Sequence, residues 1–464
     1  MNRIAPSHNP AHALGMQPTT HPVIRLALLI FLILLVYDGA LRKWLLPGYE
    51  QLIFVAKDML LFTTLVVTGF ASKMNSRAKF TTAAQFLLAL YALWTILEVF
   101  NLNLPNLLVG AWGLKAHLLY ASLIVLIPLA FQRLEDIYSA LVKIYPWIVI
   151  PVVLLALLQV ASPAYDVINQ HVRGGIEGQA YFGDTSLVRV TGTFSYISGM
   201  SSFVLASVLL GVGLYLQGAR SKIFLMGVAF ALLAMPITGS RGVILVVTVS
   251  LALMLISAVF AGRILAKQAF TAVFVFSVFA IISLYSQTGA WQALQQRAEA
   301  ARGDQYRVFT AFTNAFEHFD SAGIAGFGTG SANLGSPILA NDVDAFSWLP
   351  AGMGFEEESG RIVIELGILG WLISLLMRLC FLLWAIELLR NGKTPNVRTT
   401  GIIALPIVAF GFYAGNGVFA VPLAAVYYWF CIALLAMAEH ENRQIPKRNS
   451  LQSPSDIKPA WSRS

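Results

Sequence analysis

Charged residues are scarce in this sequence. Only 12% of its 464 residues are Asp, Glu, Lys or Arg, whereas 57% are hydrophobic and the mean hydropathy is +0.71. This composition excludes a soluble globular protein, because segments long enough to cross a bilayer recur along nearly the whole chain. The net charge of +8 does not indicate nucleic-acid binding, since the basic residues lie in short turns between apolar segments. We therefore expect a lipid bilayer, and no nucleic acid, as the partner of this chain.

Cysteine is also rare, and both positions, Cys380 and Cys431, fall inside apolar segments. This placement argues against a disulfide framework and against a cysteine metal site. The sequence has no P-loop, no HExxH, no Cys/His cluster and no GxSxG nucleophile elbow. The GFGTG run at 326–330 has no strand pattern before it and no suitably spaced acidic residue after it, so it predicts a turn. We expect neither a metal nor a cofactor.

Apolar runs divide the chain into about twelve spans when a window of roughly 19 residues is used. The runs begin near Val23, Gln51, Phe80, Asn106, Tyr138, Thr191, Ile223, Val243, Ala269, Ile362, Thr399 and Gly417. The first run follows a polar leader and lacks a small-residue cleavage site, so we expect no cleavable signal peptide. The prediction is an all-α integral membrane protein with about twelve transmembrane helices.

The charge of the turns predicts the orientation. With the N-terminus inside, the inner segments read SKMNSRAK, QRLED, GARSK, GRILAK, RNGKTPNVR and ENRQIPKR, and all but QRLED are clearly basic. Because positive charge collects on the cytoplasmic side, both tails, 1–22 and 439–464, are predicted to be cytoplasmic. The predicted regions between them are helices one to nine in 23–287 with an outer loop near 162–190, a large partly helical outer loop at 288–360, and helices ten to twelve in 361–438.

The large outer loop contains an interrupted amphipathic helix pattern. Phe309, Phe312, Phe316 and Phe319 recur at helical spacing and form one apolar stripe. Such a stripe lies at the membrane surface or packs against the helix bundle. Packing alone accounts for the phenylalanines, whereas a loop of this length is typically functional.

Two arginines stand at the predicted outer boundary, against the usual charge bias. Arg189 precedes TGTF before the sixth span, and Arg241 follows TGS at the outer end of the seventh. Arginine binds phosphate through a planar fork that is always charged, so this pair suits a lipid-linked pyrophosphate. The alternative is that both side chains extend to lipid headgroups.

Further ionisable residues lie at the outer end of the first span and inside the second. Arg42 and Lys43 also violate the charge bias, and Lys57 and Asp58 lie roughly 10 Å into the second span. Neighbours on a helix do not face each other, so Lys57 and Asp58 are expected to have separate partners. Asp38 is a candidate partner for Lys57. Ionisable residues within the membrane indicate either a structural pair or a functional site. In the second interpretation, Arg42 and Lys57 are candidates for binding the pyrophosphate or another part of the substrate.

An acidic run, Glu356–Glu358, precedes the tenth span. If a helix starts there, Glu358, Arg361 and Glu365 share one face. A carboxylate among arginines outside the bilayer could remove a proton from a sugar hydroxyl. The alternative is an acidic cap favoured by the helix dipole. His318 is a second candidate base.

The chain resembles the O-antigen ligase and polymerase superfamily of bacterial inner-membrane glycosyltransferases. The resemblance rests on the order of four patterns: RVTGTFSYISG from Arg189, TGSRGVIL from Thr238, Arg307 with the downstream GIAGFGTGS, and EEESGRIVIELGILG. It implies a metal-independent transfer on the periplasmic face, with an undecaprenyl-pyrophosphate-linked oligosaccharide as donor. It also implies that Arg189 and Arg241, with Arg307 as a further candidate, bind the pyrophosphate, and that other polysaccharide-assembly proteins are partners.

One departure from the pattern bears on the activity. Ligases of this superfamily often carry a His-Asn pair roughly where Glu356 and Glu357 stand. Its absence favours an exopolysaccharide or O-antigen polymerase, and DGALRKWLLP with FVAKD resembles a subgroup of exopolysaccharide polymerases. In this interpretation Glu358 or a neighbour activates the acceptor, while Arg361 and Arg307 position the glycan. The alternatives are a ligase, which moves glycan to a lipid or protein acceptor, and a polysaccharide transporter.

Overall fold

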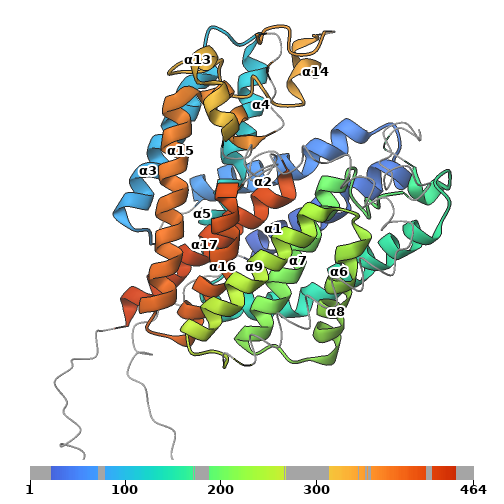
Figure 1. The fold of residues 1–464 in the computed structure, drawn as a ribbon, viewed down its shortest axis with the longest axis vertical. Helices are drawn as coiled ribbons and strands as arrows, with labels where there is room; N and C mark the ends of the chain where they lie inside the picture. Colours follow the sequence, from blue (N-terminus) through green and yellow to red (C-terminus); the bar gives the residue numbers. More distant parts are fainter. Residues whose placement is uncertain are drawn as a thin grey trace, which may run out of the picture.

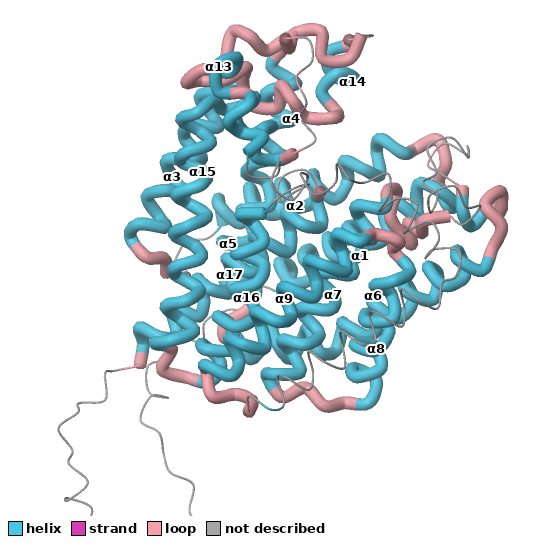
Figure 2. The backbone as a smooth tube through the Cα atoms, in the orientation of Figure 1, coloured by secondary structure: helices cyan, strands magenta, loops and turns pink. Residues whose placement is uncertain are grey.

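The computed structural model describes residues 22–71, 79–170, 172, 188–265, 267, 313–342, 344–350, 353, 357–413 and 421–445. All the elements in these ranges are helices, as Figures 1 and 2 show. In chain order they are α1 (Pro22–Ala40), α2 (Glu50–Ala71), α3 (Thr82–Leu97), α4 (Leu107–Leu118), α5 (Leu123–Ala130), α6 (Leu134–Ala161), α7 (Ile197–Gln217), α8 (Lys222–Ile237), α9 (Arg241–Phe260), α13 (Phe319–Ala322), α14 (Ser336–Ala340), α15 (Glu358–Asn391), α16 (Pro395–Tyr413) and α17 (Pro422–Gln444). Short π or 3₁₀ segments are η2 (Leu41–Leu45), η3 (Glu98–Phe100), η4 (Leu119–Ser122) and η5 (Val167–Asn169).

Nine helical segments in the described ranges are long and apolar enough to cross a membrane. They are Pro22–Leu45, Glu50–Gly69, Thr82–Phe100, Leu107–Ala130, Leu134–Ala161, Ile197–Gln217, Val243–Phe260, Glu358–Asn391 and Pro422–Gln444. Helix α8 is apolar but has only 16 residues, and the span expected near Ala269 lies outside the described residues. The fold is therefore that of a multi-pass α-helical membrane protein, and the number twelve stays a prediction.

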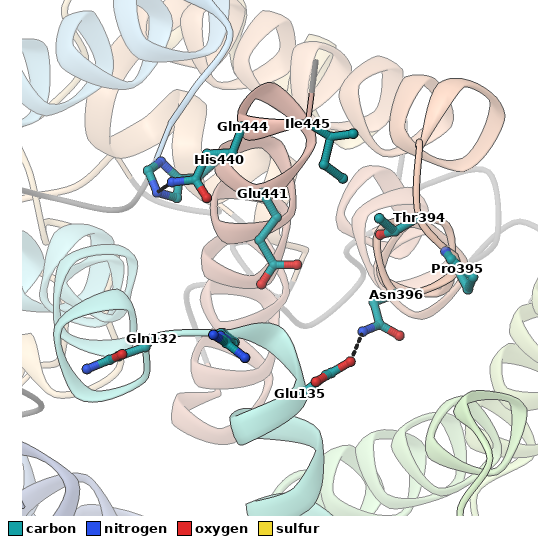
Figure 3. Close-up of a pocket in the computed structure, with 10 residues that line it drawn as sticks. Gln132, Glu135, Thr394, Pro395, Asn396, His440, Glu441, Gln444 and Ile445 are labelled. Atoms are coloured by element: carbon teal, nitrogen blue, oxygen red, sulfur yellow. Dashed lines mark hydrogen bonds between the residues drawn. The ribbon is translucent and has the colours of Figure 1, made fainter. Parts of the chain in front are cut away.

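The predicted inner turns meet at one end of the bundle. Hydrogen bonds join them: Arg443 donates to the Phe80 carbonyl, Gln217 to Asn396, Arg263 to the Pro395 carbonyl, and the Leu134 amide to Glu441. An open cavity of about 730 Å³ lies between the ends of α6, α16 and α17 and is lined by Glu135, Asn396 and Glu441, among others (Figure 3). We call this end of the bundle the basic end. The turns that the charge pattern assigns to one side of the membrane thus lie together, and that this side faces the cytoplasm remains a prediction.

Helix α15 reverses direction at Gly367, where the backbone takes φ +69° and ψ −176°. The carboxylate of Glu358 and the guanidinium of Arg378 are 20 residues apart yet only 2.5 Å from each other, whereas a straight helix would separate them by about 30 Å. Residues 358–366 therefore form a half-helix that folds back on 368–378. The sequence predicted a continuous tenth span from about Ile362 instead.

Loop residues close this break in the backbone. The carbonyls of Gly323 and Ile324 accept the amides of the first two residues after Gly367, and the indole of Trp94 donates to the Leu366 carbonyl at 2.9 Å. A broken helix inside a membrane protein is tolerated where neighbouring groups satisfy the freed backbone in this way. Figure 1 shows α13, α14 and α4 gathered at the same end of α15, opposite the basic end. We call this the loop end.

The predicted phenylalanine stripe packs against α15 where it is described. The rings of Phe316 and Phe319 both contact Trp371, with centroids 5.7 Å and 5.4 Å from the indole. This favours the packing interpretation for these two residues. Phe309 and Phe312 lie outside the described residues.

Candidate functional site

A buried ion pair joins α1 and α2 near the loop end. The Nζ atom of Lys57 lies 2.7 Å from a carboxylate oxygen of Asp38, and Arg42 approaches the same oxygen at 3.5 Å. Lys57 also donates to the Phe54 carbonyl at 2.8 Å, and its side chain is only 1% exposed. The predicted pairing of Asp38 with Lys57 is confirmed. In this buried position Lys57 is placed to hold Asp38, and its role in binding a substrate stays a prediction.

Asp58 has different partners, as expected for adjacent residues on a helix. Its carboxylate lies 2.7 Å from the Nζ atom of Lys115 and accepts a hydrogen bond of 2.8 Å from the hydroxyl of Tyr120. Lys115 comes from α4 and was not predicted as a site residue. Its side chain is 19% exposed, compared with 1% for Lys57. Lys115 is therefore the more accessible of these two lysines.

Aromatic rings hold the cations of this region together. Lys57, Lys115 and Arg42 lie 4.2, 5.0 and 5.1 Å from the centre of the Phe54 ring, and Lys115 lies 4.0 Å from that of Trp112. Such contacts stabilise a cation without neutralising its charge. We call Asp38, Arg42, Lys43, Lys57, Asp58 and Lys115 the cation cluster. Counted by formal charge, it has four basic side chains and two carboxylates, an excess of two positive charges, and an excess of this kind attracts anions.

The segment that begins at Arg189 packs directly on the cation cluster. Lys43 donates to the hydroxyl of Thr191 at 2.6 Å, and the hydroxyl of Thr193 donates to the Val36 carbonyl at 2.6 Å. Gly39 permits this approach, because a Cβ atom there would lie 2.5 Å from the Thr193 carbonyl oxygen. Arg189 is partly exposed and lies two residues before Thr191. The structure thus brings the first predicted phosphate-binding segment to the end of α1.

The other predicted arginines are less fully described. Arg241 is the first residue of α9, directly after the Ser240 cap, but its side chain, like all of Arg307, lies outside the described residues. That Arg241 and Arg307 lie in one site with Arg189 stays a prediction.

A second set of charges surrounds the half-helix of α15. Glu358 is its first residue, and its carboxylate pairs with Arg378 at 2.5 Å and with Arg361 at 3.9 Å. Arg378, which was not predicted, also donates to the Gly411 carbonyl. Glu358 is 1% exposed, so its carboxylate is enclosed by two arginines rather than open to a substrate. Glu356 lies outside the described residues.

Two further predicted or neighbouring groups, Glu357 and His318, adjoin this enclosed pair. Glu357 is partly exposed. His318 is buried and lies against the first turn of the half-helix, because a Cβ atom on Gly360 would be 3.0 Å from its ring. The structure therefore brings together His318, Glu358 and Arg361, three of the predicted site residues.

A buried histidine–glutamate pair connects the half-helix to α4. His117 Nε2 lies 2.7 Å from a carboxylate oxygen of Glu365, and His117 Nδ1 lies 2.7 Å from the hydroxyl of Tyr91. The same oxygen of Glu365 accepts the Gly330 amide at 3.0 Å. The second oxygen of Glu365 and Nη2 of Arg361 are buried without a hydrogen-bond partner among the described residues. Buried polar atoms of this kind are commonly satisfied by water or a ligand.

The GFGTG turn contacts this histidine–glutamate pair. The sequence predicted the turn but not its contact with the pair. Its Gly330 packs so closely on Gly113 of α4 that a Cβ atom on Gly113 would lie 2.3 Å from the Gly330 nitrogen. Thr329 also donates to the Thr95 carbonyl at 2.7 Å. The turn is thus fixed between α3, α4 and the half-helix. No sequence spacing could indicate this, because the contact joins residues far apart in the chain.

Replacing Gly113 by alanine is expected to displace this turn. The added methyl group has no room beside the Gly330 backbone, so the unfolding free energy should fall by about 1–3 kcal/mol. Gly69→Ala is the control, since no heavy atom lies within 4 Å of a Cβ atom there and alanine favours a helix. Thermal unfolding of the detergent-purified variants measures both effects. Equal midpoints for Gly113→Ala and the wild type would contradict the close contact.

In comparisons with known proteins, no family model, no curated protein and no solved structure matches this chain. The residues of the two charged regions, and the sequence patterns that meet there, therefore carry the assignment of a function.

Proposed function

We propose that this protein is an inner-membrane polymerase of exopolysaccharide or O-antigen. In this proposal it transfers an undecaprenyl-pyrophosphate-linked glycan to a sugar hydroxyl on the periplasmic face, without a metal. The observation that carries the proposal is the surplus of positive charge in the cation cluster, packed against the segment of Arg189. A cationic surplus that no described carboxylate balances suits a pyrophosphate group.

In the proposed reaction, the negative charge that develops on the leaving pyrophosphate lies at the cation cluster. The acceptor hydroxyl loses its proton to a base, its oxygen bonds to the anomeric carbon, and the bond from that carbon to the pyrophosphate oxygen breaks. Negative charge then accumulates on the departing pyrophosphate, where fixed positive groups stabilise the transition state. We assign this role to Lys115, Arg42, Arg189 and Arg241. Lys115 enters the set because it is the more accessible lysine of the cluster.

The base is proposed among the groups at the start of the half-helix. Glu358 is held by Arg378 and Arg361, which suits a positioning role. Glu357 precedes it and has one buried carboxylate oxygen, but the residue as a whole is partly exposed, so we propose it as the carboxylate better placed to meet a hydroxyl. His318 is the second candidate. Arg361 has a buried Nη2 group without a described hydrogen-bond partner and is proposed to position the glycan.

A size-resolved glycan assay tests the proposal. Purified protein is supplied with lipid-linked repeat units, and the products are separated on a gel over time. A polymerase should yield a ladder that lengthens with time. A single transferred block on a lipid or protein acceptor would replace the polymerase by a ligase. No new glycosidic bond with folded protein and the cognate repeat unit would reject both enzymes.

Transport is the second candidate, and the broken helices favour it. The segment Leu107–Ala130 is interrupted by η4 just after His117, and α15 is broken at Gly367 just after Glu365. Transporters often build their substrate sites from paired discontinuous helices near the membrane midplane. Proteoliposomes loaded with labelled glycan decide between these functions. Transport predicts movement across the bilayer without a new glycosidic bond, whereas the polymerase predicts bond formation without such movement.

A further inference from the structure

An apolar crevice runs along α1 from its first turn, at Arg25, to the turn before Asp38. It has a volume of about 230 Å³ and is enclosed by α1, α5, α6, α7 and α17. It extends along α1 from Arg25 to Val36, which corresponds to about 17 Å at the helical rise of 1.5 Å per residue. Leu32 of α1 and Ile148 of α6 line it and are partly exposed, so the crevice opens toward the surroundings of the bundle.

Arg25 is the one charged residue among the described residues that line this crevice. Its Nε atom donates to the Ala130 carbonyl at 2.6 Å, and its guanidinium lies 4.9 Å from the centre of the Phe131 ring. These contacts fix the guanidinium at the basic end. Within the described part of the chain it forms no ion pair with a carboxylate, and its two Nη groups have no hydrogen bond. An oriented guanidinium with two free donor groups is suited to a phosphate.

We propose that this crevice binds one anionic phospholipid from the leaflet at the basic end, with its phosphate on Arg25 and an acyl chain along α1. The length of the crevice is close to the half-thickness of a bilayer core, about 15 Å. Basic groups between helices at this membrane surface are typical sites for anionic headgroups. The site is separate from the proposed pyrophosphate site, because Arg25 and the cation cluster lie at opposite ends of α1. It does not depend on the proposed function.

Delipidated protein titrated with single lipids tests the proposal, with binding read by native mass spectrometry and thermal unfolding. Phosphatidylglycerol is expected to bind with a stoichiometry of one and to raise the unfolding midpoint more than phosphatidylethanolamine with the same chains. Arg25→Gln is expected to weaken phosphatidylglycerol binding about tenfold or more, since a charged hydrogen bond is lost. Ala206→Phe, which fills the crevice from α7, should weaken binding with Arg25 intact.

The matched control is Arg220→Gln at the same end of the bundle. Arg220 stacks on Tyr215 at 3.7 Å, donates to backbone carbonyls of its own turn and does not line the crevice, so its loss should leave binding unchanged. Equal affinities of the wild type for the two phospholipids would overturn the proposal without any variant. So would unchanged binding in Arg25→Gln, or displacement of phosphatidylglycerol by polyprenyl pyrophosphate.

Discussion

Replacing Lys115 by alanine is expected to lower the rate of glycan transfer about 100- to 1,000-fold, the effect of removing one donor to a developing oxyanion. Lys115 is the lysine of the cation cluster with appreciable exposure, and it is oriented by Asp58 at 2.7 Å and by the ring of Trp112 at 4.0 Å. Its loss removes positive charge where the leaving pyrophosphate is proposed to sit. Initial rates of ladder formation with lipid-linked repeat units measure the effect.

Two variants separate this role from folding. Lys115→Arg keeps the charge and should keep a substantial part of the activity. Lys57→Met should lower the unfolding free energy by about 3 kcal/mol, because Asp38 stays buried and keeps, among the described ion pairs, the longer one with Arg42 at 3.5 Å. Loss of Lys115 is thus expected to lower the transfer rate, whereas loss of Lys57 is expected to lower the stability. Transfer at the wild-type rate by folded Lys115→Ala would remove the cation cluster from the site.

The predicted arginines extend the same test. Arg189→Ala and Arg241→Ala should each leave folded protein in the membrane but abolish long glycan. Arg189 is connected to the cluster through the Thr191–Lys43 hydrogen bond, so its effect should resemble that of Lys115→Ala. Long glycan retained in both arginine variants would reject the pyrophosphate assignment, whatever the result at Lys115.

The part of this site that sequence could predict is the part built from neighbouring helices. Asp38 and Lys57 lie on α1 and α2, which are consecutive and joined by a short connection. Their similar depth in the membrane follows from counting residues along each helix. A buried charge also requires a counter-charge. These two facts were enough to predict the pair that the structure contains at 2.7 Å.

Lys115 and Arg378 were missed for one physical reason. Each is a cation within an apolar stretch of its helix, and its partner lies on a segment whose approach depends on the tertiary fold. Lys115 meets Asp58 only because α4 packs beside α2, and Arg378 meets Glu358 only because α15 reverses at Gly367. A lone glycine in a helical pattern indicates a weak point but not a reversal. The contact of Gly113 with Gly330 is equally invisible to any local pattern.

Replacing Glu358 by glutamine is expected to lower the unfolding free energy by about 3–5 kcal/mol, because it leaves a buried arginine without its counter-charge. Arg378 is 6% exposed and lies 2.5 Å from this carboxylate. The pair holds the half-helix against the rest of α15. Thermal unfolding of the purified variant, measured alongside glycan transfer, gives the size of the effect.

The double variant Glu358→Leu with Arg378→Met distinguishes positioning from proton transfer. Replacing both members of a buried ion pair by apolar residues of similar size restores most of the stability lost when one is removed. If Glu358 only positions the half-helix, the double variant should regain the fold together with measurable transfer, and Glu357→Gln should be the inactive folded variant. If Glu358 is itself the base, the double variant should be stable and inactive. Recovery of the fold without activity would therefore return the catalytic role to Glu358, since the half-helix would then be in place without its proton acceptor.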